Sequence, residues 1–168
     1  DTLTDIQRAA RFYYLTKMAF GARVNSPTFG ICATGAPRLN LLRVEEDLSE
    51  ARVRLSRVYI ENKPYAQVID RFDKPGTLFY LDPPYFGCEK DYGAGLFGRE
   101  DFQRLADQLA GVGGKFILSL NDAPEVREVF GRFEIESVAT RYSINSAKSK
   151  AVGEVLITNF TPVIPGSS

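Results

Sequence analysis

The tetrapeptide Asp82-Pro83-Pro84-Tyr85 carries the side chains best suited to chemistry in this chain of 168 residues. Its two prolines fix two φ angles and remove two backbone donors, so the carbonyl groups around them have little freedom to move. Asp82 offers a carboxylate, and Tyr85 offers a flat aromatic face. Acceptors on Asp82 and on the Pro83 carbonyl can hold both hydrogens of an exocyclic amine, while Tyr85 stacks on the ring that carries the amine.

This combination favours methyl transfer to the amino group of a nucleic-acid base. The lone pair of such an amine is delocalised into the ring, and two acceptors draw the nitrogen toward a more tetrahedral, more nucleophilic form that faces a sulfonium methyl group. No covalent intermediate is needed. The base must first leave the duplex, after which Tyr85, and also Phe86, can stack on it. The alternative is that the tetrapeptide forms a rigid surface turn with a capping aspartate.

The composition excludes several other kinds of site. The sequence contains no histidine, which removes the Ser-His-Asp triad, the usual general base and most zinc sites. Cys32 and Cys88 have neither metal nor redox spacing, so two free thiols in a reducing cytoplasm are favoured over a disulfide. No apolar run approaches the ~18 residues of a membrane span. We therefore expect a cytoplasmic protein.

The charges are balanced overall but unevenly distributed. The chain has 21 basic and 21 acidic residues, yet residues 6–44 and 139–153 contain no Asp or Glu. Two acid-free stretches in a neutral chain indicate a one-sided positive field, which is typical of a protein that binds a polyanion; chance clustering on solvated faces is the alternative. The basic residues of the two stretches are Arg8, Arg11, Lys17, Arg23, Arg38 and Arg43, and then Arg141, Lys148 and Lys150.

Double-stranded DNA is the polyanion that fits a base-binding site. Arg23, Asn25 and Arg38 lie in a Gly- and Pro-rich segment, residues 20–38, which predicts a long functional loop. Arginine can bind guanine bidentately and asparagine can read adenine, whereas contact with phosphate alone would position the protein without specifying a sequence. We expect the second basic group to contact the DNA backbone near the extruded base; its members are Arg141, Lys148 and Lys150.

Hydrophobic spacing predicts the elements that position these residues. The nearly continuous apolar run 77–81 predicts a buried parallel strand, and ligands of open α/β sheets bind at the carboxyl ends of such strands. The full order of elements predicts an α/β fold with an antiparallel edge. Helices are expected at residues 4–18, 40–57, 64–72, 99–110 and 124–130, and strands at 58–60, 77–81, 115–120, 134–140 and 152–160.

Two domains are expected, divided at the turn Asp73-Lys74-Pro75-Gly76. Residues 1–74 form a mainly helical, basic region, and its first helix begins with the capping box Thr4-Asp5-Ile6-Gln7. Residues 75–168 form the α/β part that contains the tetrapeptide.

Several segments, in order and spacing, resemble one family over residues 8–160. Besides Asp82-Pro83-Pro84-Tyr85, they are residues 8–15, 96–102, 114–122, 140–144 and 152–157. Together they resemble the Dam-type (D12 class) adenine-N6 DNA methyltransferases.

The resemblance implies a partial Rossmann-like methyltransferase sheet with a helical target-recognition subdomain. It implies S-adenosylmethionine as methyl donor and N6 of adenine in double-stranded DNA as acceptor. Asp82 and Pro83 then bind the target amine within the catalytic motif that Pro84 and Tyr85 complete. The resemblance also suggests cofactor contacts from Asp82, Phe97, Asp101 and Phe102. Capping and packing of a helix are the alternative for Asp101 and Phe102. The resemblance places Asn121 and Asp122 at the active-site end of a strand, and capping of the helix at residue 124 is the alternative for them.

The sequence departs from this family in one important respect. Members carry an aromatic-x-Gly-x-Gly segment before the recognition insert, and no such segment is present; Gly93-x-Gly95 and Gly111-x-Gly113-Gly114 fit turns better. We therefore expect a companion chain or a further N-terminal segment to supply the rest of the cofactor site. Two alternatives stay open: a catalytically incomplete DNA-binding fragment, and an amino-methyltransferase that acts on cytosine N4.

Overall fold

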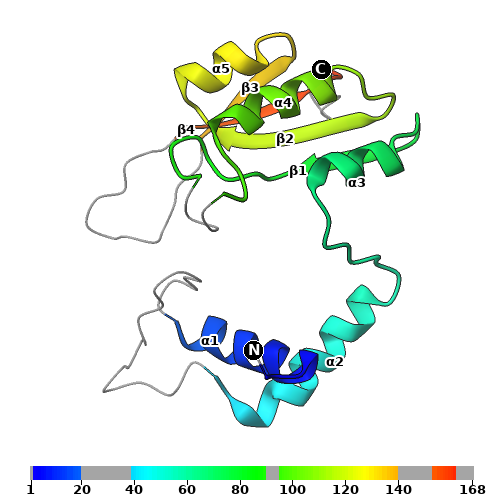
Figure 1. Cartoon of the computed structure of the whole chain (residues 1–168), viewed down its shortest axis with the longest axis vertical. Coiled ribbons are helices and arrows are strands. Elements are labelled where there is room, and N and C mark those ends of the chain that lie inside the picture. Colours follow the sequence, from blue (N-terminus) through cyan, green and yellow to red (C-terminus); the bar gives the residue numbers. More distant parts are fainter. Residues whose placement is uncertain (1, 20–38, 90–94, 140–152, 162–168) are drawn as a thin grey trace, which may run out of the picture. The chain divides into compact units, whose positions relative to one another are not determined.

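The structure, a computed structural model, describes residues 2–19, 39–89, 95–139 and 153–161 in two compact units (Figure 1). The first unit is Asp1–Glu61 and the second is Asn62–Ser168. The change in composition predicts a division near residue 74, whereas in the structure residues 62–74 cluster with the second unit. Within the described residues, no helix combines the length and hydropathy that crossing a membrane requires.

The first unit is helical, as expected. Helix α1, Asp5–Met18, begins with the predicted capping box, in which the Gln7 amide donates to Thr4 Oγ1 and the Thr4 amide donates to Gln7 Oε1 at 2.9 Å. The helix expected at residues 40–57 is shorter: a 3-10 turn, Leu41–Arg43, precedes α2, Val44–Leu55. Neither α1 nor α2 contains a buried residue.

The prediction of a strand at residues 58–60 is wrong. Val58, Tyr59 and Ile60 form no strand, and their exposed fractions are 53%, 90% and 79%. A short apolar run becomes a strand only where a neighbouring strand accepts its backbone hydrogen bonds and a core receives its side chains. Among the described residues, these three have neither.

The second unit contains a four-stranded sheet. Its strands are β1 (Leu78–Leu81), β2 (Lys115–Asn121), β3 (Glu134–Ala139) and β4 (Gly153–Thr158), in the order β1-β2-β4-β3 (Figure 1). β1 and β2 are parallel, while β4 is antiparallel to both β2 and β3. The predicted α/β organisation with an antiparallel strand pair is confirmed.

Three helices accompany the sheet: α3 (Tyr65–Phe72), α4 (Arg99–Leu109) and α5 (Pro124–Phe130). Helix α4 lies between the parallel strands β1 and β2 in the chain, as a crossover connection requires. Alternate residues of β2 point into one core, where each fully buried Leu or Phe contributes about 1.5–3 kcal/mol. Side chains with at most 2% exposure in this core are Ile69, Phe102, Leu105, Ala106, Leu109, Phe116, Leu118, Leu120, Val126, Phe130, Val155 and Ile157.

Strand β1 lies at one edge of the sheet within the described part of the chain. Phe79 faces the core and is 9% exposed, whereas Leu78 and Tyr80 on the other face are 59% and 65% exposed. The prediction that this segment is a strand is confirmed, but the prediction that it is buried holds for one face only. The carboxyl end of this edge strand leads directly into Asp82.

Candidate active site

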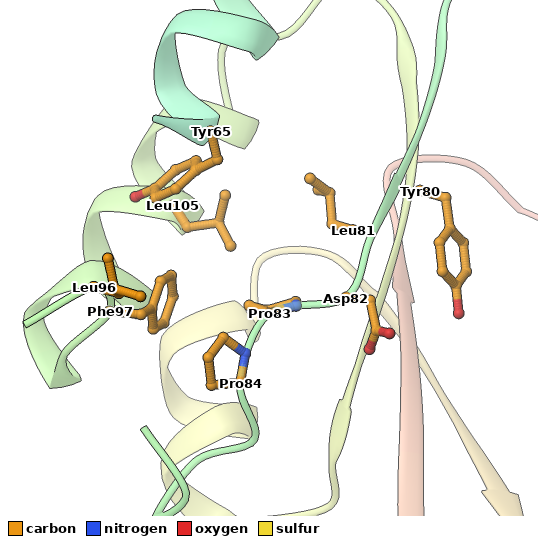
Figure 2. Close-up of a pocket in the computed structure, with 9 residues that line it drawn as sticks. All are labelled: Tyr65, Tyr80, Leu81, Asp82, Pro83, Pro84, Leu96, Phe97 and Leu105. Carbon is orange, nitrogen blue, oxygen red and sulfur yellow. The ribbon is translucent and has the colours of Figure 1, made fainter. Parts of the chain in front are cut away.

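The diproline segment lines a cavity of about 480 Å³ in the second unit (Figure 2). Alternation along β1 sends Tyr80 and Asp82 to one side of the chain and Leu81 to the other, as Figure 2 shows. The Asp82 side chain is exposed, while Pro83 and Pro84 are half-buried. The residues around the cavity are Tyr65, Tyr80, Leu81, Asp82, Pro83, Pro84, Leu96, Phe97 and Leu105.

Aromatic rings form the wall of the cavity that faces the prolines. Tyr65 of α3 and Phe97 lie with their ring centroids 6.0 Å apart, and Phe97 meets Phe102 edge-on at 4.9 Å. Burial raises the pKa of the Tyr65 hydroxyl, and the nearby Asp101 carboxylate raises it further, against the opposing charge of Arg104. The wall therefore presents a neutral phenol beside apolar rings.

The residues suggested as cofactor contacts occupy different places. Phe97 is 8% exposed and lines the cavity with Asp82. The Asp101 carboxylate accepts hydrogen bonds from the Gly98 amide at 2.8 Å and from Arg104 Nη1 at 3.1 Å, which caps the start of α4. Phe102 is 1% exposed and belongs to the core. Capping and packing thus describe the contacts of Asp101 and Phe102 in this structure, and their cofactor role stays a prediction.

The loop after the prolines is tied to two neighbouring strands. The Tyr85 hydroxyl donates a hydrogen bond to Glu154 Oε1 on β4. The Phe86 amide donates to Asn121 Oδ1 at 2.8 Å, and Asn121 Nδ2 donates to the Phe86 carbonyl at 3.1 Å. Tyr85 is half-buried and is not among the residues that line the cavity.

The Phe86 ring packs against side chains of α4. It lies 5.3 Å from the Phe102 ring and 4.9 Å from the Arg99 guanidinium at the start of α4. Residues of α4 therefore contact the Phe86 ring, and Asn121 of β2 holds its backbone.

Neither side chain suggested as a cap for the helix at residue 124 has that role. The N-cap of α5 is Ala123, which forms no side-chain hydrogen bond. Asn121 holds Phe86, and Asp122 forms a bidentate pair with Arg127 Nε and Nη2 at 2.7 and 2.9 Å.

The sequence alone did not indicate a role for Glu154, which holds the Tyr85 hydroxyl. An acidic residue near the start of a predicted strand is common at solvated sheet edges, so the position of Glu154 in the sequence did not indicate a function.

The six residues suggested as DNA contacts lie outside the described residues: Arg23, Asn25, Arg38, Arg141, Lys148 and Lys150. Their roles stay predictions.

In the described part of the first basic stretch, several cations are paired with carboxylates, which reduces the one-sided positive field expected there. Arg8 pairs with Asp5, Lys17 with Asp47 at 3.7 Å, and Arg43 with Glu46 at 3.3 Å.

The chain is similar in sequence to proteins that are named as methyltransferases. The family model for D12 class N6 adenine-specific DNA methyltransferases matches residues 1–144. Type II methyltransferase M1.LlaDCHI of Lactococcus lactis subsp. cremoris is 29% identical over 95% of this chain and 61% of its own length. Type II methyltransferase M.CviBI of Paramecium bursaria Chlorella virus NC1A is 22% identical over 90% of this chain and 58% of its own length. The chain thus spans about three fifths of the length of the curated relatives it matches.

Proposed function

Because the chain belongs to the D12 class N6 adenine-specific DNA methyltransferase family, we propose that it carries the catalytic loop of an enzyme that methylates N6 of an extruded adenine in double-stranded DNA. The observation that supports this most strongly is the diproline segment at the carboxyl end of β1, where it opens on a cavity of about 480 Å³. Small-molecule sites in proteins commonly have volumes of about 300–1,000 Å³.

The chain's own groups would act by orientation and electrostatics. The Asp82 carboxylate and the Pro83 carbonyl accept the two amine hydrogens of the base and turn the nitrogen lone pair toward the methyl donor. After methyl transfer, the surplus proton of the amine nitrogen would leave to Asp82 or to water. Tyr85 stacks on the base and holds it outside the duplex. Pro84 limits how far the segment can bend.

S-adenosylmethionine is the methyl donor we propose, and it supplies the electrophilic methyl group when bound. In this proposal Asp82 and Phe97, which line the cavity, contact it together with Asp101 and Phe102. Apolar and aromatic walls with one carboxylate suit a ligand that combines a flat adenine ring with a cationic sulfur. The remaining contacts would come from a further segment or a companion chain, which the greater length of the curated relatives supports.

The helical region, residues 1–74, would read the DNA. In this proposal Arg23, Asn25 and Arg38 contact the grooves or phosphates. Arg141, Lys148 and Lys150 contact the backbone beside the extruded adenine.

A second candidate is a DNA-binding fragment that does not transfer methyl groups. Calorimetry with S-adenosylmethionine, with and without DNA, separates the two. Cofactor binding supports the enzyme, whereas DNA binding without cofactor binding supports the fragment.

The direct test is product analysis with radioactive S-adenosylmethionine, followed by digestion of the DNA to nucleosides. We expect N6-methyladenine, and Asp82→Ala should reduce its formation by about 100-fold or more, as loss of a stabilising polar group at a reacting centre does. Asp107→Ala is the matched control, because Asp107 is an exposed carboxylate on α4 that pairs with Arg132 at 2.8 Å. Undiminished transfer by Asp82→Ala, or N4-methylcytosine as the product, would overturn the proposal.

A further inference from the structure

Two side chains that face each other across neighbouring strands hold the loop after the diproline segment. Asn121, the last residue of β2, is the direct antiparallel partner of Glu154 on β4. Glu154 accepts a hydrogen bond from the Tyr85 hydroxyl, and Asn121 binds both the amide and the carbonyl of Phe86. One pair of strand positions thus holds two consecutive loop residues.

The side-chain amide of Asn121 binds the two peptide groups that flank Phe86. Its oxygen accepts from the Phe86 N–H at 2.8 Å, and its nitrogen donates to the Phe86 carbonyl at 3.1 Å. Two bonds of opposite direction to consecutive peptide groups fix the orientation of the backbone at Phe86 as well as its position. A carboxylate at position 121 cannot do this, since it only accepts hydrogen bonds and would repel the carbonyl.

Tyr85 is therefore restrained at three points. Pro84 fixes one φ angle on its N-terminal side, Asn121 holds the next residue, and Glu154 holds the hydroxyl at the tip of the ring. A ring restrained before a ligand arrives loses less conformational entropy when the ligand binds.

We infer that Asn121 and Glu154 are positioning residues, which hold the Tyr85 ring where an extruded base stacks on it. The inference rests on the proposed function, in which Tyr85 touches the base. In this inference Asn121 and Glu154 act through Tyr85 and the loop.

Asn159 provides a matched control, because its side-chain amide also accepts one backbone hydrogen bond and donates another, at the opposite end of β2. The Phe116 amide donates to Asn159 Oδ1 at 3.0 Å, and Asn159 Nδ2 donates to the Gly114 carbonyl at 2.9 Å. Asn121→Ala and Asn159→Ala therefore remove equivalent bonds, and their structural cost should be similar. Only Asn121→Ala should release the loop.

The first measurement is binding of a short oligothymidylate with one central 2-aminopurine, whose fluorescence is quenched by stacking. Loss of the two bonds should weaken binding by about ten-fold in Asn121→Ala and in Asn121→Asp. Glu154→Ala should also weaken it, while Glu154→Gln retains an acceptor and should restore it. Asn159→Ala should bind like the wild type. Equal affinities of Asn121→Ala and Asn159→Ala would overturn the inference.

The second measurement needs no ligand. In protein labelled with fluorotyrosine, the Tyr85 signal in the fluorine NMR spectrum is identified by its absence in Tyr85→Phe. We expect Asn121→Ala to shift or broaden this signal and Asn159→Ala to leave it unchanged; an unchanged signal in Asn121→Ala would overturn the inference. A wild type that does not quench 2-aminopurine would count against the proposed function, and the Tyr85 signal would still decide whether Asn121 orders the ring.

Discussion

Asn121 and Glu154 are cross-strand partners, and their side chains bind consecutive residues of the loop that begins at Asp82. The candidate site therefore depends on three strands: β1 leads into the diproline segment, and β2 and β4 hold Tyr85 and Phe86 just beyond it. Side chains that face each other on an antiparallel pair lie close together, so one pair can act on one short segment. Glu154 on β4 holds only the Tyr85 hydroxyl, whereas Asn121 on β2 holds the backbone at Phe86.

Phe102 should matter for both stability and base binding. Its ring is 1% exposed and contacts Phe97 of the cavity wall and Phe86 of the loop. Phe102→Ala should lower the free energy of unfolding, measured with urea, by about 3–5 kcal/mol, with a smaller loss for Phe102→Leu. Phe130→Leu is the control, because Phe130 is 0% exposed in α5 and is not among the residues around the cavity.

Only Phe102→Leu should also weaken quenching of the 2-aminopurine oligonucleotide, since the ring supports both the loop and the wall. If both leucine variants bound the oligonucleotide equally well, Phe102 would be a core residue without influence on the site.

Gly114 should not tolerate a side chain. A Cβ at this position would lie 2.8 Å from the Thr77 carbonyl oxygen and 2.9 Å from the Lys74 carbonyl oxygen. Both are backbone atoms at the turn that leads into β1, so Gly114→Ala should cost about 1–3 kcal/mol of unfolding free energy. At the neighbouring Gly113 the nearest atom would be Asp73 Oδ2 at 3.8 Å. Thermal and urea unfolding should therefore show a much smaller loss for Gly113→Ala, and equal losses would contradict the contact.

The Asp122–Arg127 pair should stabilise the second unit in a pH-dependent way. The hydrogen bonds from Arg127, aided by its charge, lower the pKa of the Asp122 carboxyl group. A carboxyl group whose pKa is lower in the folded state contributes stability above its unfolded pKa, and that contribution disappears as pH falls through the folded pKa. The difference in unfolding free energy between wild type and Asp122→Asn should be constant above about pH 4 and shrink below it.

Urea unfolding at a series of pH values measures this difference. In an Arg127→Met background, Asp122→Asn should cause much less pH-dependent change, because the partner of the carboxylate is gone. A difference of the same size at every pH would show that the pair does not act through ionisation.

Lys148, which lies outside the described residues, should contribute to DNA binding without selecting a sequence. Lys148→Ala should weaken binding of unrelated duplexes to a similar extent and reduce the slope of log K against log salt concentration by about 0.9. Lys115→Ala is a charge-matched control, since Lys115 is exposed at the start of β2, the end of the strand opposite to Asn121. An unchanged slope in Lys148→Ala would remove this residue from the interface.

Much of the second unit could be predicted from local sequence. Helix α5 begins at Pro124 and ends at Phe130, as expected, because proline is favoured at the first helical position and the apolar spacing ends there. The expected strand at 115–120 and the helix at 99–110 agree with β2 and α4 to within one residue. The diproline motif was also visible, since its rigidity is a property of the residues themselves.

Tertiary structure decided which distant residues serve that motif. Glu154 is 69 positions from Tyr85, and Asn121 is 35 positions from Phe86, so neither contact has a local signal. Val58-Tyr59-Ile60 and Leu78-Phe79-Tyr80 are both short apolar runs, yet only the second is a strand, because β2 pairs with it. Helix caps and rigid turns depend on neighbours along the chain. Strand pairing and the side chains it brings together depend on neighbours in space, and only the folded sheet determines those.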